Sequence, residues 1–340
     1  MTLSSSPHPP ALSVVVPCLN EQASLPQFVD RMVRACEAAA DGSYEIIFVN
    51  DGSTDDTWSC VCAMALTRPG LVGINLTRNH GQQLAVTAGL SEARGRRVLI
   101  IDADLQDPPE VLGEMMDRMD QGFDVVFGRR RQRQGETRFK QGTAYYFYRL
   151  LAKVSDVEIP SDTGDFRLIS RAIVDRLNAM PEQDRFLRGM VAWLGGRQCE
   201  LLYDRERRSA GQTGYTLSKM ARLALAGITG FSTAPLRLAA MTTLLGMAIG
   251  AALAAYIVGA VIAGKVVAGW ASLALIMVFF STAQLASLAV ISVYVGRIFL
   301  QAKQRPLFVI DKIVRSQASI ALAPPKMRVT TTEERRVAVG

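Results

Sequence analysis

Short apolar runs alternate with helical patterns over residues 11–128 of this chain. Five runs have the length and composition of buried strands, and the four stretches between them repeat apolar residues at helical spacing. The predicted strands are Leu12–Val16, Glu45–Val49, Leu71–Leu76, Val98–Ile101 and Asp124–Phe127, and the predicted helices are Ser24–Ala40, Asp56–Leu66, Gly81–Ala93 and Pro108–Gln121. This alternation predicts an α/β domain with a mostly parallel sheet and helices on both faces.

Two segments near the carboxyl end, Leu238–Gly264 and Val266–Gly296, carry no charged residue. A helix of about 27 residues is roughly 40 Å long, whereas the hydrocarbon core of a bilayer measures about 30 Å. The sequence therefore predicts a two-helix transmembrane hairpin, with helices over about 238–264 and 270–296.

Basic residues flank both predicted spans, while the link between the spans carries only Lys265. They are Lys219, Arg222 and Arg237 before the first span, and Arg297, Lys303, Arg305, Lys312 and Arg315 after the second. By the positive-inside rule, both flanks and both termini are cytoplasmic and the tip of the hairpin is outside. The chain is thus expected to be a multi-pass protein whose catalytic domain faces the cytoplasm.

The predicted domain organisation has five parts. A disordered leader at 1–10 precedes a catalytic domain at 11–217. An interfacial amphipathic helix region at 218–235 follows, although this helix could equally lie in the core. The spans then occupy 236–297, and a cytoplasmic segment with a flexible tail occupies 298–340.

The formal net charge is +7, which suits anionic lipid, phosphate-bearing substrates or nucleic acid. No nucleic-acid-binding motif is present, so the predicted spans favour the first two partners. The five scattered cysteines form neither a disulfide framework nor a zinc pattern. No Gly-x-Gly-x-x-Gly follows the first strand, which argues against a dinucleotide oxidoreductase.

A polar cluster follows each of the five predicted strands. The clusters are Pro17–Glu21, Asn50–Asp55, Thr77–His80, Asp102–Asp107 and Arg129–Arg131. In open parallel sheets ligands bind outside the carboxyl ends of the strands, so these loops are expected to converge on one cleft.

Asp102 and Asp104 form the sharpest candidate site. Two carboxylates one residue apart on a turn after a strand can approach one hard divalent cation, and Gln106 adds a neutral oxygen. A bound Mg²⁺ or Mn²⁺ would bridge the diphosphate of a nucleotide sugar and stabilise the charge on the leaving nucleotide. Asp51 is expected to accept a hydrogen bond from the ring N–H of uracil or guanine, and Glu21 to do the same or to hold the ribose. The competing interpretation of the loop after Asn50 is an Asx turn that caps the next helix.

The strings Val14–Glu21, Asn50–Asp55 and Asp102–Glu110 resemble those of the family 2 glycosyltransferases of GT-A fold. Three further strings and the two terminal spans are similar to the polyprenyl-phosphate glycosyltransferases, which include bactoprenol glucosyltransferases and dolichol-phosphate mannose synthases. Those strings are Asp162–Leu168, Arg185–Trp193 and Ile228–Leu238. The resemblance implies an inverting hexosyltransferase that uses a nucleotide diphosphate sugar, UDP-glucose first, and a divalent metal. It also implies an undecaprenyl phosphate acceptor in the bacterial inner membrane and a lipid-linked sugar for the cell envelope.

The resemblance assigns roles by position. Pro17, Glu21, Asp51, Asp102 and Arg205 match donor-binding residues, and Asp102, Asp104 and Gln106 match the metal site. Asp165, Asp104 and Arg129 match catalytic positions, with Asp165 in a loop near the acceptor, and Arg129, Arg131 and Arg167 match positions that bind the acceptor phosphate. A lipid phosphate has a second pKa near 6 and is already mostly a dianion. Asp165 is therefore better suited to orienting the acceptor than to acting as a general base, and the alternative is a buried structural carboxylate paired with Arg167.

Two other functions compete with this one. A processive polysaccharide synthase usually carries a Gln-x-x-Arg-Trp motif and more spans, and the stretch from Gln183 lacks that tryptophan. A non-catalytic membrane anchor would be free to lose the Asp102 and Asp104 pair, which is intact here. Small residues in the first span, Gly246, Gly250, Ala251 and Ala254, would let helices pack closely and suggest a homo-oligomer.

Overall fold

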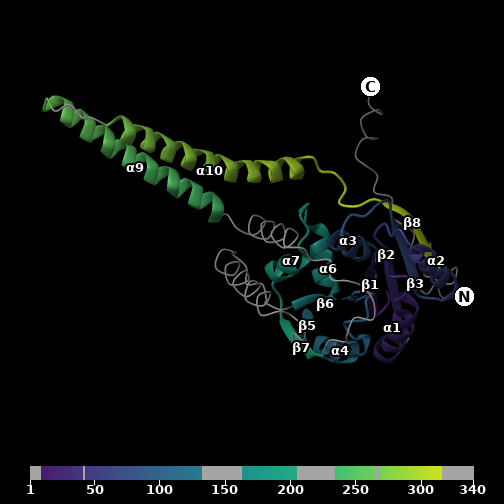
Figure 1. The fold of residues 1–340 in the computed structure, drawn as a ribbon. Coiled ribbons are helices and arrows are strands. Elements are labelled where there is room, and N and C mark those ends of the chain that lie inside the picture. The colour runs from purple at the N-terminus through teal and green to yellow at the C-terminus, as the bar shows by residue number, and fades with distance from the viewer. Residues whose placement is uncertain (1–8, 41–42, 132–162, 205–233, 265–268, 316–340) are drawn as a thin grey trace, which may run out of the picture.

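The computed structural model describes residues 9–40, 43–131, 163–204, 234–264 and 269–315. These residues form a layered α/β domain and a pair of long helices that project from it (Figure 1). Residues 1–8 of the predicted leader, residues 218–233 of the predicted amphipathic region and the tail after Arg315 lie outside the described residues.

The core of the domain is a single mixed sheet of eight strands in the order β7-β5-β6-β4-β1-β2-β3-β8. Strand β4 pairs in parallel with β1, β1 with β2, β2 with β3, and β5 with β7, whereas β6 runs antiparallel to both β4 and β5 and β8 runs antiparallel to β3. The strands are β1 Leu12–Cys18, β2 Tyr44–Asn50, β3 Leu71–Leu76, β4 Arg97–Ile100, β5 Val125–Arg130, β6 Thr163–Ser170, β7 Gln198–Tyr203 and β8 Ile310–Arg315.

Helices cover both faces of this sheet, as the apolar pattern predicts. One hydrophobic cluster joins one face to α1, α2 and α4, and a second joins the other face to α3, α6 and α7. The helices are α1 Leu25–Ala40, α2 Thr57–Thr67, α3 Gln82–Glu92, the short 3-10 helix η1 Pro109–Val111, α4 Leu112–Asp120, α6 Arg171–Ala179 and α7 Leu187–Leu194. The predicted α/β fold with a mostly parallel sheet is confirmed.

The structure corrects two details of the strand prediction. The stretch Gly164–Arg167, expected as a loop, lies inside β6 in the middle of the sheet. The fifth strand continues to Arg130, so Arg129 lies within it instead of after it. Strands β7 and β8 were not predicted, since neither is a continuous apolar run.

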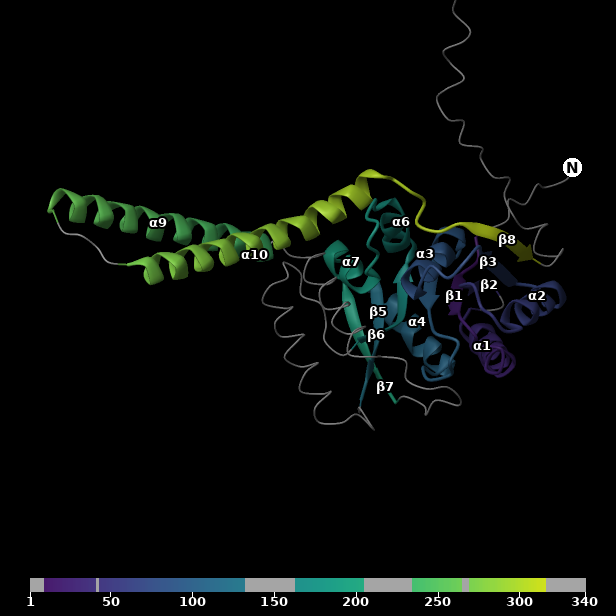
Figure 2. The ribbon, with the colours of Figure 1, turned by 45° about the horizontal axis from the view of Figure 1, so that its top comes forward.

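Two long helices follow the domain, α9 Ala234–Ile262 and α10 Trp270–Ala302. They lie side by side in both views (Figures 1 and 2). Each contains a stretch long and apolar enough to cross a membrane, Leu238–Ala260 and Phe279–Ala302, and neither stretch is buried in the protein. Both helices reach beyond the charge-free segments, so that α10 includes Arg297.

After α10 the chain returns to the sheet and adds β8 at its edge (Figure 2). Ile313 of β8 stands opposite Ile74 of β3, and the Thr77 N–H donates a hydrogen bond of 3.0 Å to the Val309 carbonyl. The sheet is therefore completed by residues that lie beyond both apolar helices.

Candidate functional site

Several of the predicted site residues lie at the carboxyl ends of the parallel strands. Strand β6 is antiparallel to β4, so its amino end reaches the same edge of the sheet as the carboxyl end of β4. The last registered pair is Ile100 with Arg167, and continuing this register places Asp165 opposite Asp102. The sheet topology thus brings together two carboxylates that are far apart in the sequence.

Asp102 lies among several carboxylates. Its Oδ1 atom accepts a hydrogen bond of 2.8 Å from the side-chain amide of Gln82. Burial raises the pKa of Asp102 to about 7, and the charges of neighbouring carboxylates add to this effect. Those neighbours are Asp165, Asp104 and Asp107. Such a concentration of negative charge favours a bound cation.

The predicted metal ligands fit a magnesium or manganese site whose coordination is completed by phosphate oxygens of the substrate. Asp104 accepts a hydrogen bond of 3.1 Å from the Gln106 N–H, so the turn after Asp102 is folded back on itself, with Leu105 at a positive φ of 59°. Among the described residues no group of three or more acidic, histidine or cysteine side chains is placed to enclose a metal. Mg²⁺ is often held by only one or two carboxylates together with substrate phosphates, and this donor set matches that pattern.

Both oxygens of Asp165 are held by the protein. Oδ1 accepts a hydrogen bond of 2.7 Å from Arg188 Nε on α7, and Oδ2 accepts one of 3.1 Å from Gln83 Nε2 on α3. Burial by itself raises the pKa of Asp165, but Arg188, Arg167 and the Gln83 hydrogen bond together outweigh this effect, and the pKa is lowered overall. Asp165 is therefore an ionised, oriented carboxylate. Neither Arg188 nor Gln83 is among the site residues predicted from the sequence, although Arg188 lies within the Arg185–Trp193 string.

Asp51 has a clear structural role in the loop after β3. Its side chain is 2% exposed, and its two oxygens accept hydrogen bonds from the backbone N–H groups of His80 (2.7 Å) and Gly81 (2.9 Å). Burial raises its pKa, and these hydrogen bonds oppose that shift. Asp51 thus fixes the start of α3, and its expected contact with a nucleotide base stays a prediction.

Among the described arginines at the end of β5, Arg130 approaches one of these carboxylates. Its Nη2 atom lies 3.9 Å from Asp107, beside the Tyr203 hydroxyl. Arg129 pairs at 2.9 Å with Glu200 on the neighbouring β7, and both side chains are well exposed. The sequence predicts Arg129, Arg131 and Arg167 for the acceptor phosphate, and the structure makes Arg130, from the same basic run, a further candidate.

The remaining predicted residues have varied surroundings. Pro17 is buried inside β1 instead of lying in the loop after it. Arg131 pairs with the exposed Asp204 at 3.3 Å. Glu21 accepts a hydrogen bond of 2.8 Å from the Ser24 hydroxyl. Arg167 is only 4% exposed and donates to the Gly164 carbonyl at 3.1 Å, and burial lowers its pKa to about 10. Arg205 lies outside the described residues.

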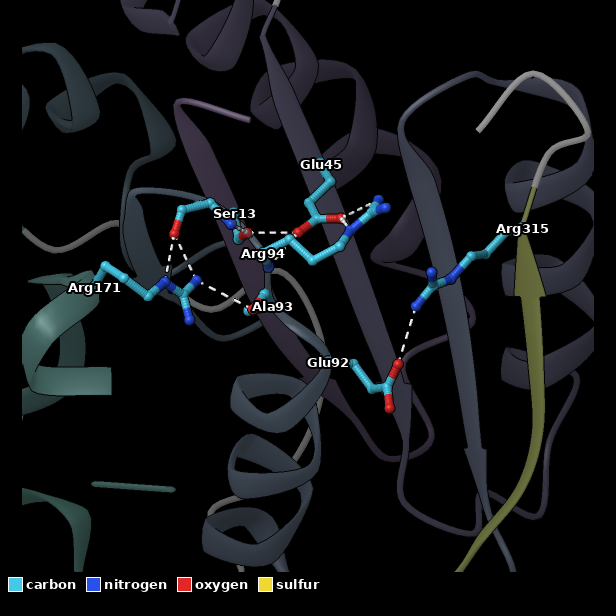
Figure 3. Close-up of polar contacts among 8 residues, drawn as sticks. Ser13, Glu45, Glu92, Ala93, Arg94, Arg171 and Arg315 are labelled. Atoms are coloured by element: carbon cyan, nitrogen blue, oxygen red, sulfur yellow. Dashed lines mark hydrogen bonds and ion pairs between the residues drawn. The ribbon is translucent and has the colours of Figure 1, made fainter. Parts of the chain in front are cut away.

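A second polar network lies at the amino ends of the parallel strands, opposite the carboxylates (Figure 3). The buried Glu45 accepts hydrogen bonds from the Arg94 guanidinium at 2.8 Å and from the Ser13 hydroxyl at 2.6 Å. Arg171 donates to the Ala93 carbonyl at 3.1 Å. These contacts join β1, β2 and α6 to the turn that follows α3.

Comparison with known proteins agrees with this architecture. Residues 13–177 match the model of glycosyl transferase family 2. A Bacillus subtilis protein named uncharacterized glycosyltransferase YkcC is 41% identical over 302 residues, which are 88% of this chain and 93% of that relative. The prophage bactoprenol glucosyl transferase homolog of Escherichia coli is 38% identical over 308 residues, 89% of this chain and 99% of that relative.

A solved structure adds a more distant likeness. Glucosyl-3-phosphoglycerate synthase from Mycobacterium tuberculosis, in complex with Mn²⁺, UDP-glucose and phosphoglyceric acid, is 22% identical with a TM-score of 0.42. The match covers 65% of this chain and 78% of that one.

The domain, with carboxylates at the carboxyl ends of its parallel strands, is thus that of a GT-A glycosyltransferase. The chain belongs to glycosyl transferase family 2 and is close to the bactoprenol glucosyl transferases.

Proposed function

We propose that this protein transfers a hexose, glucose from UDP-glucose first, onto undecaprenyl phosphate at the cytoplasmic face of a bacterial inner membrane. The product would be a lipid-linked sugar for modification of the cell envelope. The observation that carries the proposal is that the similarity to bactoprenol glucosyl transferases spans the catalytic sheet and both apolar helices together, over 89% of this chain. A relationship limited to the sheet would support only nucleotide-sugar chemistry.

The geometry supports a division of work at the sheet edge. Asp102 and Asp104, with Gln106 beside them, would hold Mg²⁺ or Mn²⁺. The metal supplies Lewis-acid stabilisation of the leaving nucleotide diphosphate. The loops that carry Glu21 and Asp51 would hold the nucleoside.

Asp165 is suited to orient the acceptor phosphate. A carboxylate whose pKa is lowered by Arg188 is a weak base, and the lipid phosphate is already ionised at neutral pH. Direct attack of a phosphate oxygen on the anomeric carbon, with departure of the nucleotide diphosphate on the opposite side, gives inversion. Arg130, or Arg129 at the same strand end, would offset the charge of the incoming phosphate.

The proposal is tested with purified protein in detergent. Undecaprenyl phosphate, Mg²⁺ or Mn²⁺, and each of UDP-glucose, UDP-galactose, UDP-GlcNAc and GDP-mannose would be supplied in turn, and lipid products followed by mass spectrometry. We expect metal-dependent product with one donor, and a loss of about a hundredfold or more in Asp104→Asn. Asp117→Asn, an exposed carboxylate on α4, is the matched control and should keep full activity.

Other outcomes assign the protein elsewhere. Release of a soluble polymer would indicate a processive synthase. Failure to bind UDP or GDP, with no product from any donor, would indicate a membrane anchor of glycosyltransferase fold.

A further inference from the structure

The carboxyl end of α10 is tied to the segment that joins α6 to α7 (Figure 2). Gln301 donates its side-chain amide to the Pro181 carbonyl at 2.6 Å, and its side-chain oxygen accepts from the Gln183 N–H at 2.9 Å. Gln183 returns a hydrogen bond of 3.1 Å to the Arg305 carbonyl. A long apolar helix and a short loop of the catalytic domain therefore hold one another through several polar contacts.

An ion pair and a buried arginine extend this attachment. Arg297 of α10 pairs with Asp184 at 3.0 Å. The next residue, Arg185, is 9% exposed and donates to the Leu177 carbonyl at 2.7 Å and the Met180 carbonyl at 2.6 Å. These carbonyls lie at the end of α6, so the segment is fixed to the domain as well as to α10. We call the contacts of Arg297 and Gln301 with 181–184 the α10 joint.

The same segment leads directly to the partners of Asp165. The Leu187 N–H, at the start of α7, donates to Gln83 Oε1 at 3.1 Å, and the Gln83 amide donates to Asp165 at 3.1 Å. Arg188 donates to the other oxygen of Asp165 at 2.7 Å. Both groups that orient Asp165 are therefore placed by residues that begin three positions after Asp184.

We propose that the α10 joint positions Asp165, with Gln83 and Arg188 as the positioning residues and Gln301 and Arg297 as the residues that set them in place. The inference rests on the proposed function, in which the acceptor phosphate reaches Asp165 from the membrane surface. A carboxylate that has a fixed position relative to a membrane-spanning helix also has a fixed distance from the membrane surface, where it would meet the lipid headgroup. Misplacement of reacting groups by about 1 Å can cost about a hundredfold in rate.

The first test is hydrogen exchange, which needs no activity. The Arg297→Ala, Gln301→Ala double variant in detergent should exchange peptides that contain the Leu187 amide about tenfold faster, because the segment that places this donor is released. Amides of the β1–β2 pair should be unchanged. Gln304→Ala, one position beyond the helix cap, replaces the same residue type in the same turn and should leave exchange as in the wild type.

The second test is kinetic. The double variant should lose about tenfold in kcat with undecaprenyl phosphate while KM for the nucleotide sugar changes less than about twofold. Arg297→Asp should lose activity and regain it in combination with Asp184→Arg, which rebuilds the pair in reverse. Unchanged Leu187 exchange, or unchanged kcat in the double variant, would overturn the proposal. Wild-type protein without transferase activity would refute the proposed function, while the exchange result still decides whether α10 holds the partners of Asp165.

Discussion

The Asp102 side chain is placed where its negative charge is unfavourable in the protein alone. It lies among other carboxylates and accepts a hydrogen bond from Gln82, and burial together with those neighbouring charges raises its pKa to about 7. Ionisation at neutral pH therefore opposes folding, since a group whose native pKa is raised is more stable in its protonated form. A carboxylate whose charge is destabilised in this way is typical of a binding or catalytic site.

Replacing Asp102 with asparagine separates stability from function. Asp102→Asn keeps the shape and the oxygen that accepts from Gln82 but removes the charge. We expect the metal-free variant to melt a few degrees above the wild type, because repulsion from Asp165 is relieved. The rise in melting temperature on adding Mn²⁺ should be lost, together with about a hundredfold or more of the activity. Asp117→Asn is the control, and a variant that melts below the wild type would contradict the role given to the carboxylate cluster.

Asp51 carries a different prediction because both of its oxygens already have backbone partners. Asp51→Ala leaves the N–H groups of His80 and Gly81 without their acceptors. We expect the free energy of unfolding, measured with urea in detergent, to fall by about 2–3 kcal/mol. Asp51→Asn, which keeps one acceptor oxygen, should lose less. If Asp51→Asn keeps its stability but binds UDP far more weakly, base recognition is also carried by this side chain.

At the scale of elements, a buried acid connects the amino ends of β1 and β2 to the turn after α3. Glu45 on β2 is 3% exposed and holds Arg94 and Ser13, which connects β2 to β1 and to the turn after α3 (Figure 3). Glu45→Gln should lower the free energy of unfolding by about 2–3 kcal/mol, because Arg94 then keeps a charge without its counter-ion. The metal-induced rise in melting temperature should persist, since this network lies away from Asp102. Loss of the metal-induced rise in melting temperature would mean that the Glu45 network and the Asp102 site are coupled.

The sequence allowed the parallel half of the sheet to be predicted, because each of its strands is an apolar run buried on both faces. Strand β6 was missed because Asp165 and Arg167 interrupt the apolar pattern, and a buried arginine in a central strand is identified only from its tertiary contacts. The candidate site could likewise be predicted only where its residues lie close together in the sequence. Asp102 and Asp104 are separated by one residue and are recognised together in the sequence, whereas Gln83 contacts Asp165 only through the tertiary fold.

At the scale of the whole molecule, β8 constrains the path of the chain. It follows α10 and pairs with β3 in the same sheet as the strands that precede α9, and Arg315 adds an ion pair of 3.0 Å to Glu92 on α3 (Figure 3). A chain that leaves the catalytic domain and returns to the same sheet must cross a membrane an even number of times. Two spans in a hairpin satisfy this requirement, and a single span does not.

This constraint leads to a labelling prediction. Ala263, beyond the end of α9, would lie outside the cell, and Lys303, at the end of α10, would lie inside. A membrane-impermeant maleimide applied to intact cells should label Ala263→Cys and not Lys303→Cys. The native cysteines provide an internal control, since those of intermediate exposure, Cys60, Cys62 and Cys199, belong to the catalytic domain and should react only after permeabilisation.

Each alternative orientation gives a different labelling pattern. Labelling of Lys303→Cys and of the native cysteines in intact cells would place the catalytic sheet outside, away from cytoplasmic nucleotide sugars. Labelling of neither variant until permeabilisation would mean that α9 and α10 lie on the membrane surface or pack against another protein. Labelling of both variants in intact cells while the native cysteines stay unlabelled would separate β8 from the sheet it completes, because Lys303 is only seven residues from Ile310 and about 3.4 Å per residue limits its reach. Since β8 and β3 are hydrogen-bonded along their length, we expect Ala263→Cys alone to be labelled in intact cells.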